Sequence, residues 1–125
     1  MMVRTVHRSW SGEYRPIINF GGRVCFCPFA FTVSPAGDCD GVVVAGSVGA
    51  NESVGRWLPS LAAGMKRYCL ERQADGVLLT GIRVEVHAVK THPVDTSEHG
   101  VEFLAASFMH EVERESVEVA EGPES

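Results

Sequence analysis

The sequence predicts a two-layer α/β sandwich, in which two helices cover one face of a mostly antiparallel four-stranded sheet. Two observations lead to this fold class. Two segments place apolar residues at three- and four-residue steps, as amphipathic helices do. In the first segment these are Leu58, Leu61, Met65 and Tyr68 or Cys69, and in the second Val101, Leu104, Ala105, Phe108, Met109 and Val112. The other apolar segments are short and bounded by glycine or proline, and the elements follow the order strand, strand, strand, helix, strand, helix.

Length and composition are those of a single globular domain. The chain has 125 residues, of which 45% are hydrophobic and 22% charged. We expect one domain over residues 1–114 and an acidic, disordered tail over residues 115–125. Because no apolar run is long enough to cross a bilayer and the N-terminus has no signal-peptide pattern, we expect a cytoplasmic protein. We expect no cofactor.

Charge is distributed unevenly along the chain. Residues 1–23 carry a net charge of +3, whereas residues 93–125 carry −8. If the protein binds nucleic acid, we expect the contact to come from the basic N-terminal part and from the turn at His92. The acidic end should then point away.

The first half of the chain supplies three of the four predicted strands. Residues 1–15 mix apolar and basic residues, which suits an additional edge strand or an extended arm. Residues 17–20 form the first strand, and Gly21-Gly22-Arg23 a turn with a charge at its tip. Residues 24–33 form the second strand, where Pro28 favours an edge position or a bulge. A turn over residues 35–41 leads to a third, apolar strand over residues 42–48.

The second half supplies both helices and the last strand. A helix over residues 56–73 tolerates Pro59 only in its first turn. In the strand over residues 77–89, Ile82, Val84, Val86 and Ala88 alternate with polar residues. An exposed turn over residues 90–94 then leads to a second helix, with Asp95 as its N-cap and Glu98 completing a capping box.

The second strand is apolar on both faces, which a monomeric two-layer sandwich does not explain. We expect one set of its side chains to lie on the open sheet face, away from the helices: Cys25, Cys27, Phe29 and Phe31. A second copy would cover this patch in a homodimer with C2 symmetry. Alternatively, the N-terminal arm with Val3, Val6 and Trp10 folds over it.

Four segments resemble domain IV of translation elongation factor G, and of the related elongation factor 2, in the same order along the chain. The run His92-Pro93-Val94-Asp95-Thr96-Ser97-Glu98 and the following Ala105-Ala106-Ser107 resemble the family's second tip turn and its helix. Gly21-Gly22-Arg23 resembles the start of the first tip loop. Residues 57–65 resemble the family's first helix, and residues 76–84 its last strand entry.

The resemblance implies a ribosomal-protein-S5-domain-2-like fold and a role in translation. In the full-length factor this domain reaches the decoding centre of the small ribosomal subunit and contacts the tRNA–mRNA duplex. By that resemblance, the RNA- or ribosome-binding residues are those of the two tip segments, namely Gly21, Gly22, Arg23, Lys90, Thr91, His92 and Pro93.

The departures from the family exclude its GTPase chemistry. The chain has no Gly-x-x-x-x-Gly-Lys-Ser/Thr phosphate loop, so we expect a non-enzymatic, stand-alone domain. The first tip loop is also short, because Val24-Cys25-Phe26 replaces a polar run. The alternative function is a protein-interaction or homodimerisation module that kept the fold but lost ribosome binding.

The cysteines and the isolated charged residues can also be explained without a function. The spacing of Cys25, Cys27, Cys39 and Cys69 does not match the cysteine pairs of zinc sites, so we expect reduced thiols and no metal. His92 is either an RNA contact or simply an exposed loop histidine. Likewise, Arg23 and Lys90 are either phosphate contacts or solvated surface charges.

Overall fold

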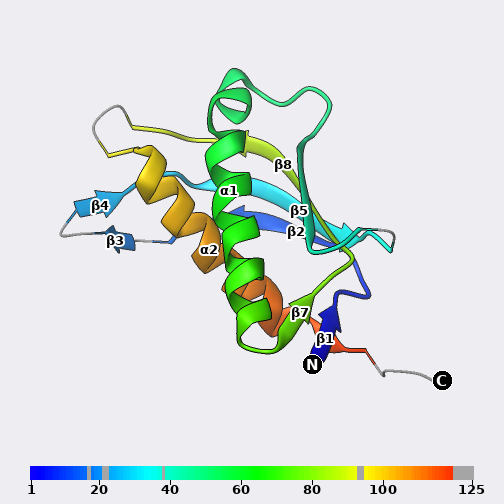
Figure 1. Cartoon of the computed structure of the whole chain (residues 1–125). Coiled ribbons are helices and arrows are strands. Elements are labelled where there is room, and N and C mark those ends of the chain that lie inside the picture. Colours follow the sequence, from blue (N-terminus) through cyan, green and yellow to red (C-terminus); the bar gives the residue numbers. More distant parts are fainter. Residues whose placement is uncertain (17, 21–22, 38, 93–94, 120–125) are drawn as a thin grey trace.

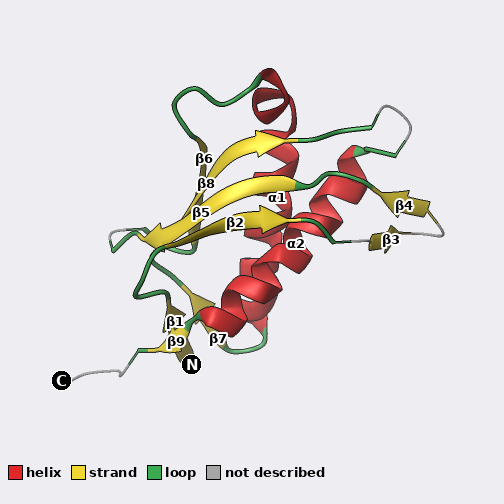
Figure 2. Cartoon of the chain, turned by 180° about the vertical axis from the view of Figure 1, so that it is seen from behind, coloured by secondary structure: helices red, strands yellow, loops and turns green. Residues whose placement is uncertain are grey.

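The computed structural model describes residues 1–16, 18–20, 23–37, 39–92 and 95–119. Helices α1 (Glu52–Ala74) and α2 (Glu98–Glu115) pack against each other on one face of a four-stranded sheet (Figures 1 and 2). The strand order is β2-β5-β8-β6, with antiparallel pairing except between β6 and β8. The predicted arrangement of two helices on a mostly antiparallel four-stranded sheet is therefore confirmed. The strands are β2 (Trp10–Tyr14), β5 (Phe29–Pro35), β8 (Ile82–Val89) and β6 (Val42–Gly46).

A second, three-stranded sheet joins the two ends of the chain and was not predicted. Its central strand β1 (Met2–Thr5) pairs parallel with β7 (Val77–Leu79) and antiparallel with β9 (Val117–Glu118). The guanidinium of Arg4 donates to the hydroxyl and the carbonyl oxygen of Ser116, both at 2.7 Å. The prediction of a disordered tail is thus wrong for residues 115–119, because Glu115 ends α2 and residues 117–119 hydrogen-bond to β1. Residues 120–125 lie outside the described part.

Two of the four arginines in residues 1–23, Arg4 and Arg8, lie beside the acidic end and not apart from it as expected. Arg4 contacts Ser116, and Arg8 forms an ion pair with Glu115 at 2.9 Å. Strand β1 and its partner β9 lie away from β3 and β4 (Figures 1 and 2). Opposite charges at the two ends of the sequence attract each other across the small sheet, which the sequence alone did not reveal.

The first two predicted strands are divided differently. Strand β3 (Ile18–Phe20) pairs with β4 (Arg23–Cys25) as a separate two-stranded ribbon. The fourth strand of the main sheet is therefore β2, and not the strand predicted at residues 17–20. The chain leaves the strand conformation at residues 26–28, because the Phe26 N–H donates to Asp95 and the Pro28 carbonyl accepts from Lys90. Pro28 therefore precedes β5, which is a central strand and not an edge.

The proposed interface residues belong to the core. Cys25, Cys27, Phe29 and Phe31 are all buried, and Phe29 and Phe31 stack edge-on against Phe108 of α2. The helices, and not a second copy or the N-terminal arm, cover this side of the strand. The outward side of β5 is polar at Thr32, whose hydroxyl hydrogen-bonds to Ser11 and to His87. The apolar-patch argument for a homodimer through the open sheet face is therefore wrong.

Two local features change the predicted alternation in the strand over residues 77–89. Gly81 has a φ of +67°, which a glycine adopts readily, and it separates β7 from β8. A β-bulge shifts the register so that Ala30 lies opposite Ala88 whereas Phe31 lies opposite Val86. As a result Val89, and not Ala88, is buried.

The apolar face of α2 is as predicted, but both helices begin at other residues. Ser97 caps α2 by accepting the Gly100 N–H, so the predicted Asp95 cap and Glu98 capping box are wrong. Asn51 caps α1, which starts at Glu52 and places Pro59 in the helix interior. Pro59 deprives the Gly55 carbonyl of its usual donor, yet the helix continues because its buried face packs on α2. The buried residues of α2 include Val101, Leu104, Ala105, Phe108, Met109 and Val112.

A charged cluster joins the C-terminal end of α2 to α1 and makes the stability of the fold depend on pH. Glu113 accepts hydrogen bonds from Tyr68 at 2.6 Å and from two nitrogens of Arg72 at 2.9 and 3.0 Å. Burial works to raise the pKa of Glu113, but these hydrogen bonds outweigh it and hold the pKa below its ordinary value. The carboxylate therefore stabilises the fold above the unfolded-state pKa, and this contribution is lost as the pH falls through the folded-state pKa.

We expect Glu113→Gln to flatten this acid dependence. Urea unfolding of both proteins from about pH 6 to pH 3 measures it, because the lost stability falls in the range where a carboxylate with a lowered pKa gains its proton. The wild-type free energy of unfolding should fall more steeply than that of the variant. Equal slopes would show that the Arg72–Glu113 pair does not carry the dependence.

Candidate nucleic-acid interface

Hydrogen bonds hold residues 90–92 and 95–96 together at one end of the main sheet. The Thr96 hydroxyl donates to the Phe26 carbonyl at 2.6 Å and accepts the His92 N–H at 2.8 Å. The N–H groups of Asp95 and Thr96 donate to the His92 carbonyl at 3.2 and 3.0 Å. The Lys90 N–H donates to the Pro28 carbonyl at 2.9 Å. These contacts join the turn to the segment between β4 and β5.

The turn brings together part of the predicted binding set. Lys90, Thr91 and His92 are all exposed on it. The β3–β4 ribbon extends from the same end of the molecule as this turn (Figure 1), with Phe20 opposite Arg23 in the pairing. We call the described residues 90–92 and 95–96, together with this ribbon, the tip. Gly21, Gly22 and Pro93 lie outside the described residues, and so does the side chain of Arg23.

Acidic side chains lie beside the basic ones at the tip. Lys90 is 3.8 Å from a carboxylate oxygen of Glu13, whose other carboxylate oxygen is 3.4 Å from Arg15. His92 Nδ1 lies 3.4 Å from the Asp95 carboxylate and 3.3 Å from the Asp95 backbone nitrogen. The edge strand expected within residues 1–15 is confirmed by β2, which lies at the edge of the main sheet. The sequence did not reveal its register against β5, so the position of Glu13 and Arg15 beside Lys90 was missed.

The thiols below the tip are packing groups. Cys25 is buried against the first turn of α2, where a Cβ on Gly100 would lie 2.6 Å from its sulfur. Burial raises the pKa of the Cys25 thiol, and it raises the pKa of Cys27 to about 12. Both thiols therefore stay protonated at neutral pH, unlike the thiolates that bind metals. Among the described residues, no three His, Cys, Asp or Glu side chains are grouped as a metal site.

Thr96→Val should loosen the tip without disturbing the core. The substitution keeps the shape of the side chain but removes both hydrogen bonds of its hydroxyl, each with a net contribution of about 1 kcal/mol. Amide hydrogen exchange should speed up at His92 and stay unchanged at core amides of β5. Thr91→Val is the matched control, since Thr91 is an exposed threonine of the same turn. Unchanged exchange at His92 would show that Thr96 does not hold the turn.

Comparisons with known proteins give similarity of fold alone. No protein-family model matches the chain, and no curated protein matches it. Among solved structures, the chain resembles the crystal structure of ttk003000868 from Thermus thermophilus, with a TM-score of 0.60 and 18% sequence identity. The match covers 84% of this chain and 16% of that one, so the chain spans about a sixth of the length of its structural neighbour.

None of the helices in the described residues has the length and apolar character needed to cross a membrane. The longer helix, α1, carries charged residues along its length, among them Arg56, Lys66 and Arg72.

Proposed function

We propose that the chain is a non-enzymatic RNA-binding domain of the elongation-factor-G domain IV type, with an S5-domain-2-like fold, and that it contacts small-subunit ribosomal RNA through the tip. The observation that carries this proposal is the pair of hydrogen bonds by which Thr96 joins His92 to Phe26. They hold the backbone at His92, so less backbone entropy is lost on binding, and Lys90, Thr91 and His92 are exposed to solvent.

The chemistry of the three exposed side chains suits RNA. Lys90 supplies a charge for a phosphate, and the imidazole of His92 provides a ring for stacking on an unpaired base. The Thr91 hydroxyl adds a group that pairs with a phosphate or a 2′-hydroxyl. The four resembling segments support the same assignment, because three of them fall in α1, in β7–β8 and in the turn with α2.

The acidic neighbours give a sharp test of this assignment. Glu13 lies close to both Lys90 and Arg15, so it competes with a phosphate for the two cations. We expect Glu13→Gln to tighten binding to a fluorescein-labelled hairpin of small-subunit ribosomal RNA, measured by fluorescence anisotropy. Lys90→Ala should weaken it and lower the slope of log affinity against log salt by about one phosphate contact.

Lys66→Ala is the matched control, because Lys66 is an exposed cation on α1 that lies beside β6 and β7 and is not one of the tip residues. Equal loss of affinity in the Lys66 and Lys90 variants would point to unspecific charge attraction. No response to Glu13→Gln or Lys90→Ala would exclude the tip as the binding surface.

We do not retain the alternative function of homodimerisation through the open sheet face, because the four residues expected there, Cys25, Cys27, Phe29 and Phe31, are buried in the core.

A further inference from the structure

We propose that the outer edge of β6 binds an extended peptide of a partner protein, which adds a strand to the main sheet and places side chains in the groove between β6, α1 and β7. This site is separate from the tip, and it does not depend on the function proposed for the tip. β6 lies at the end of the sheet order, and its described pairings are all with β8.

The backbone groups that face outward from β6 follow from the alternation along a strand. The Ser47 N–H donates to Val86 and the Gly41 carbonyl accepts from Ile82, so odd-numbered residues direct their N–H and C=O groups toward β8. The even-numbered residues Val42, Val44 and Gly46 therefore direct theirs to the outer edge. This is the pattern that an added strand pairs with.

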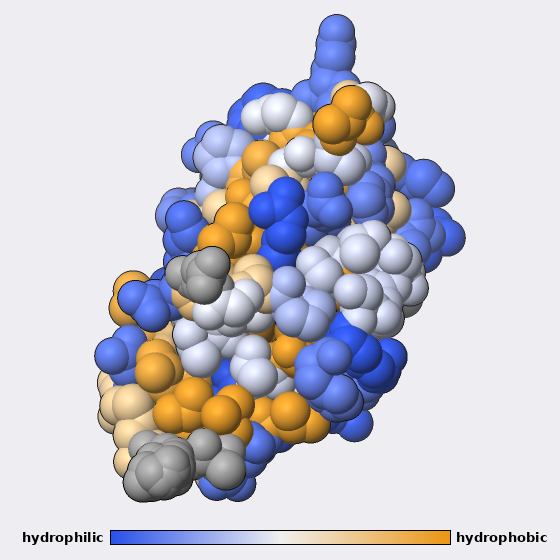
Figure 3. All heavy atoms as spheres, turned by 90° about the vertical axis from the view of Figure 1, so that its right-hand side faces the viewer, coloured by the Kyte–Doolittle hydropathy of each residue, from blue (hydrophilic) through white to orange (hydrophobic). Residues whose placement is uncertain are grey.

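Within the residues that the structure describes, this edge lacks the features that usually prevent strand addition. Exposed edge strands commonly carry charged residues or proline, or are covered by another element. β6 has the sequence Val-Val-Val-Ala-Gly, and Val43 is exposed. Figure 3 views the side of the molecule away from the tip and shows hydrophobic residues reaching the surface among polar ones.

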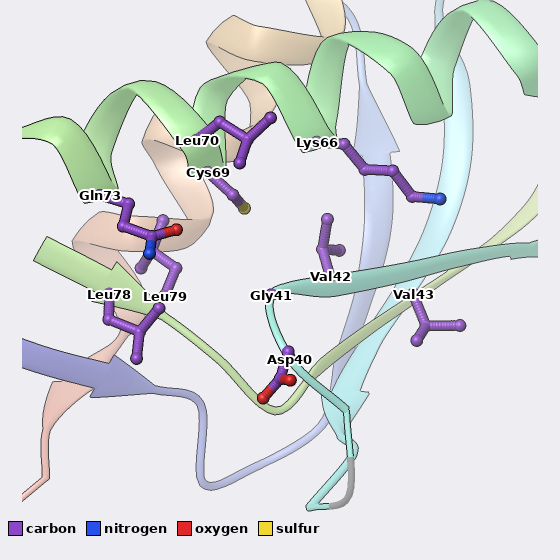
Figure 4. Close-up of a pocket in the computed structure, with 10 residues that line it drawn as sticks. All are labelled: Asp40, Gly41, Val42, Val43, Lys66, Cys69, Leu70, Gln73, Leu78 and Leu79. Atoms are coloured by element: carbon purple, nitrogen blue, oxygen red, sulfur yellow. The ribbon is translucent and has the colours of Figure 1, made fainter.

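A groove of about 770 Å³ runs beside this edge. Figure 4 shows α1 above it, with β6 and β7 on either side, and the Cys69 side chain pointing into it. Leu70 of α1 is 67% exposed and Leu79 of β7 is buried, so the lining is apolar at its centre. An added strand along β6 would place every second side chain against these residues.

The charges at the groove define the peptide. Asp40 lies at the start of β6, and Lys66 extends from α1 over the β6 side of the groove (Figure 4). Neither side chain forms an ion pair within the part of the chain that the structure describes. The matching ligand is therefore an extended apolar segment with a basic residue at one end, next to Asp40, and an acidic residue for Lys66.

A second copy of this chain fits the edge less well than a peptide does. In a C2 pair formed through β6, the groove of each copy would lie next to the same groove of the other copy. A five-residue strand also buries less area than the roughly 1,200 Å² that stable dimers need.

Two synthetic nonapeptides test the proposal. Both alternate valine with threonine; one begins with lysine and ends with glutamate, and the other has these two residues exchanged. We expect the affinities of the two peptides to differ at least about ten-fold, because for a given strand direction only one of them places its lysine next to Asp40 and its glutamate next to Lys66. On binding, amide hydrogen exchange should slow at Val44 and Gly46 but not at Val43 and Ala45, whose N–H groups already face β8.

Variants locate the site. Val44→Pro removes an outward N–H that the sheet does not use, and Leu70→Glu introduces a charge into the groove without touching the backbone; each should weaken binding at least about ten-fold. Val119→Glu, a comparable change at an exposed valine just after β9, which β1 separates from the groove strand β7, should leave binding unchanged. Unchanged affinity in Leu70→Glu, failure of both peptides to bind, or a dimer that already protects Val44 would overturn the proposal.

Discussion

Gly64→Ala should lower the free energy of unfolding by about 3 kcal/mol, at the upper end of what overpacking a core costs. The reason is the close approach of the two helices. A Cβ on Gly64 would lie 2.2 Å from the backbone oxygen of Glu102 and 2.9 Å from the Cβ of Ala105. A backbone atom does not move aside as a flexible side chain does, so the helices must separate along their whole contact. The better helix propensity of alanine offsets about 1 kcal/mol at most.

Gly55→Ala is the matched control on the same helix. A Cβ at Gly55 meets nothing within 4 Å, so only the propensity gain remains and stability should rise by up to about 1 kcal/mol. Urea unfolding of the two variants measures both effects. A Gly64→Ala protein as stable as the wild type would mean that α1 and α2 do not approach as closely as described.

Phe29→Asp should prevent folding. Phe29 is fully buried and contacts the rings of Tyr14, Phe31 and Phe108. Truncation of a buried phenylalanine to alanine alone costs about 3–5 kcal/mol. An aspartate adds the desolvation of an unpaired charge, and the sum approaches the whole stability of a typical domain, about 5–15 kcal/mol. Circular dichroism and thermal melting of the purified variant measure the loss.

Phe26→Asp is the matched control for Phe29→Asp, because Phe26 is a nearby phenylalanine that is not part of the core. The Phe26 side chain is 39% exposed, and its structural contacts with Asp95 and Thr96 are made by the backbone. This variant should fold and melt within a few degrees of the wild type. If Phe29→Asp melted as cooperatively as Phe26→Asp, the burial of Phe29 beneath α2 would be wrong.

Helical periodicity was the most informative part of the sequence, because a helix with one buried face has apolar residues at regular three- and four-residue steps. The apolar face predicted for α2 is buried throughout, and so are Leu61 and Met65 of α1. Of the two alternatives left at the next step of α1, Cys69 is buried, whereas Tyr68 and the predicted Leu58 are only partly buried. The sheet was harder. A strand that is apolar on both sides does not tell which side faces the helices, and here the wrong side was assigned at Phe29 and Phe31.

What the sequence could not give depends on contacts between distant segments. The end of the strand before Pro28 follows from hydrogen bonds to residues 90 and 95, and the order in residues 115–119 follows from pairing with β1. The tip was identified by resemblance at Lys90, Thr91 and His92. The hydrogen bond from Thr96 to Phe26 depends on the path of residues 26–28, and the closeness of Glu13 to Lys90 depends on the pairing of β2 with β5.

The most direct test of the RNA-binding proposal is co-sedimentation of the protein with purified small ribosomal subunits at low and moderate salt. We expect the wild-type protein to sediment with the subunits at low salt and to dissociate partly at moderate salt, because phosphate contacts weaken as salt rises. His92→Ala and Lys90→Ala should reduce the bound fraction, whereas Lys66→Ala should not. Absence of the protein from the pellet at both salt concentrations, or binding that is indifferent to His92 and Lys90, would contradict the proposal.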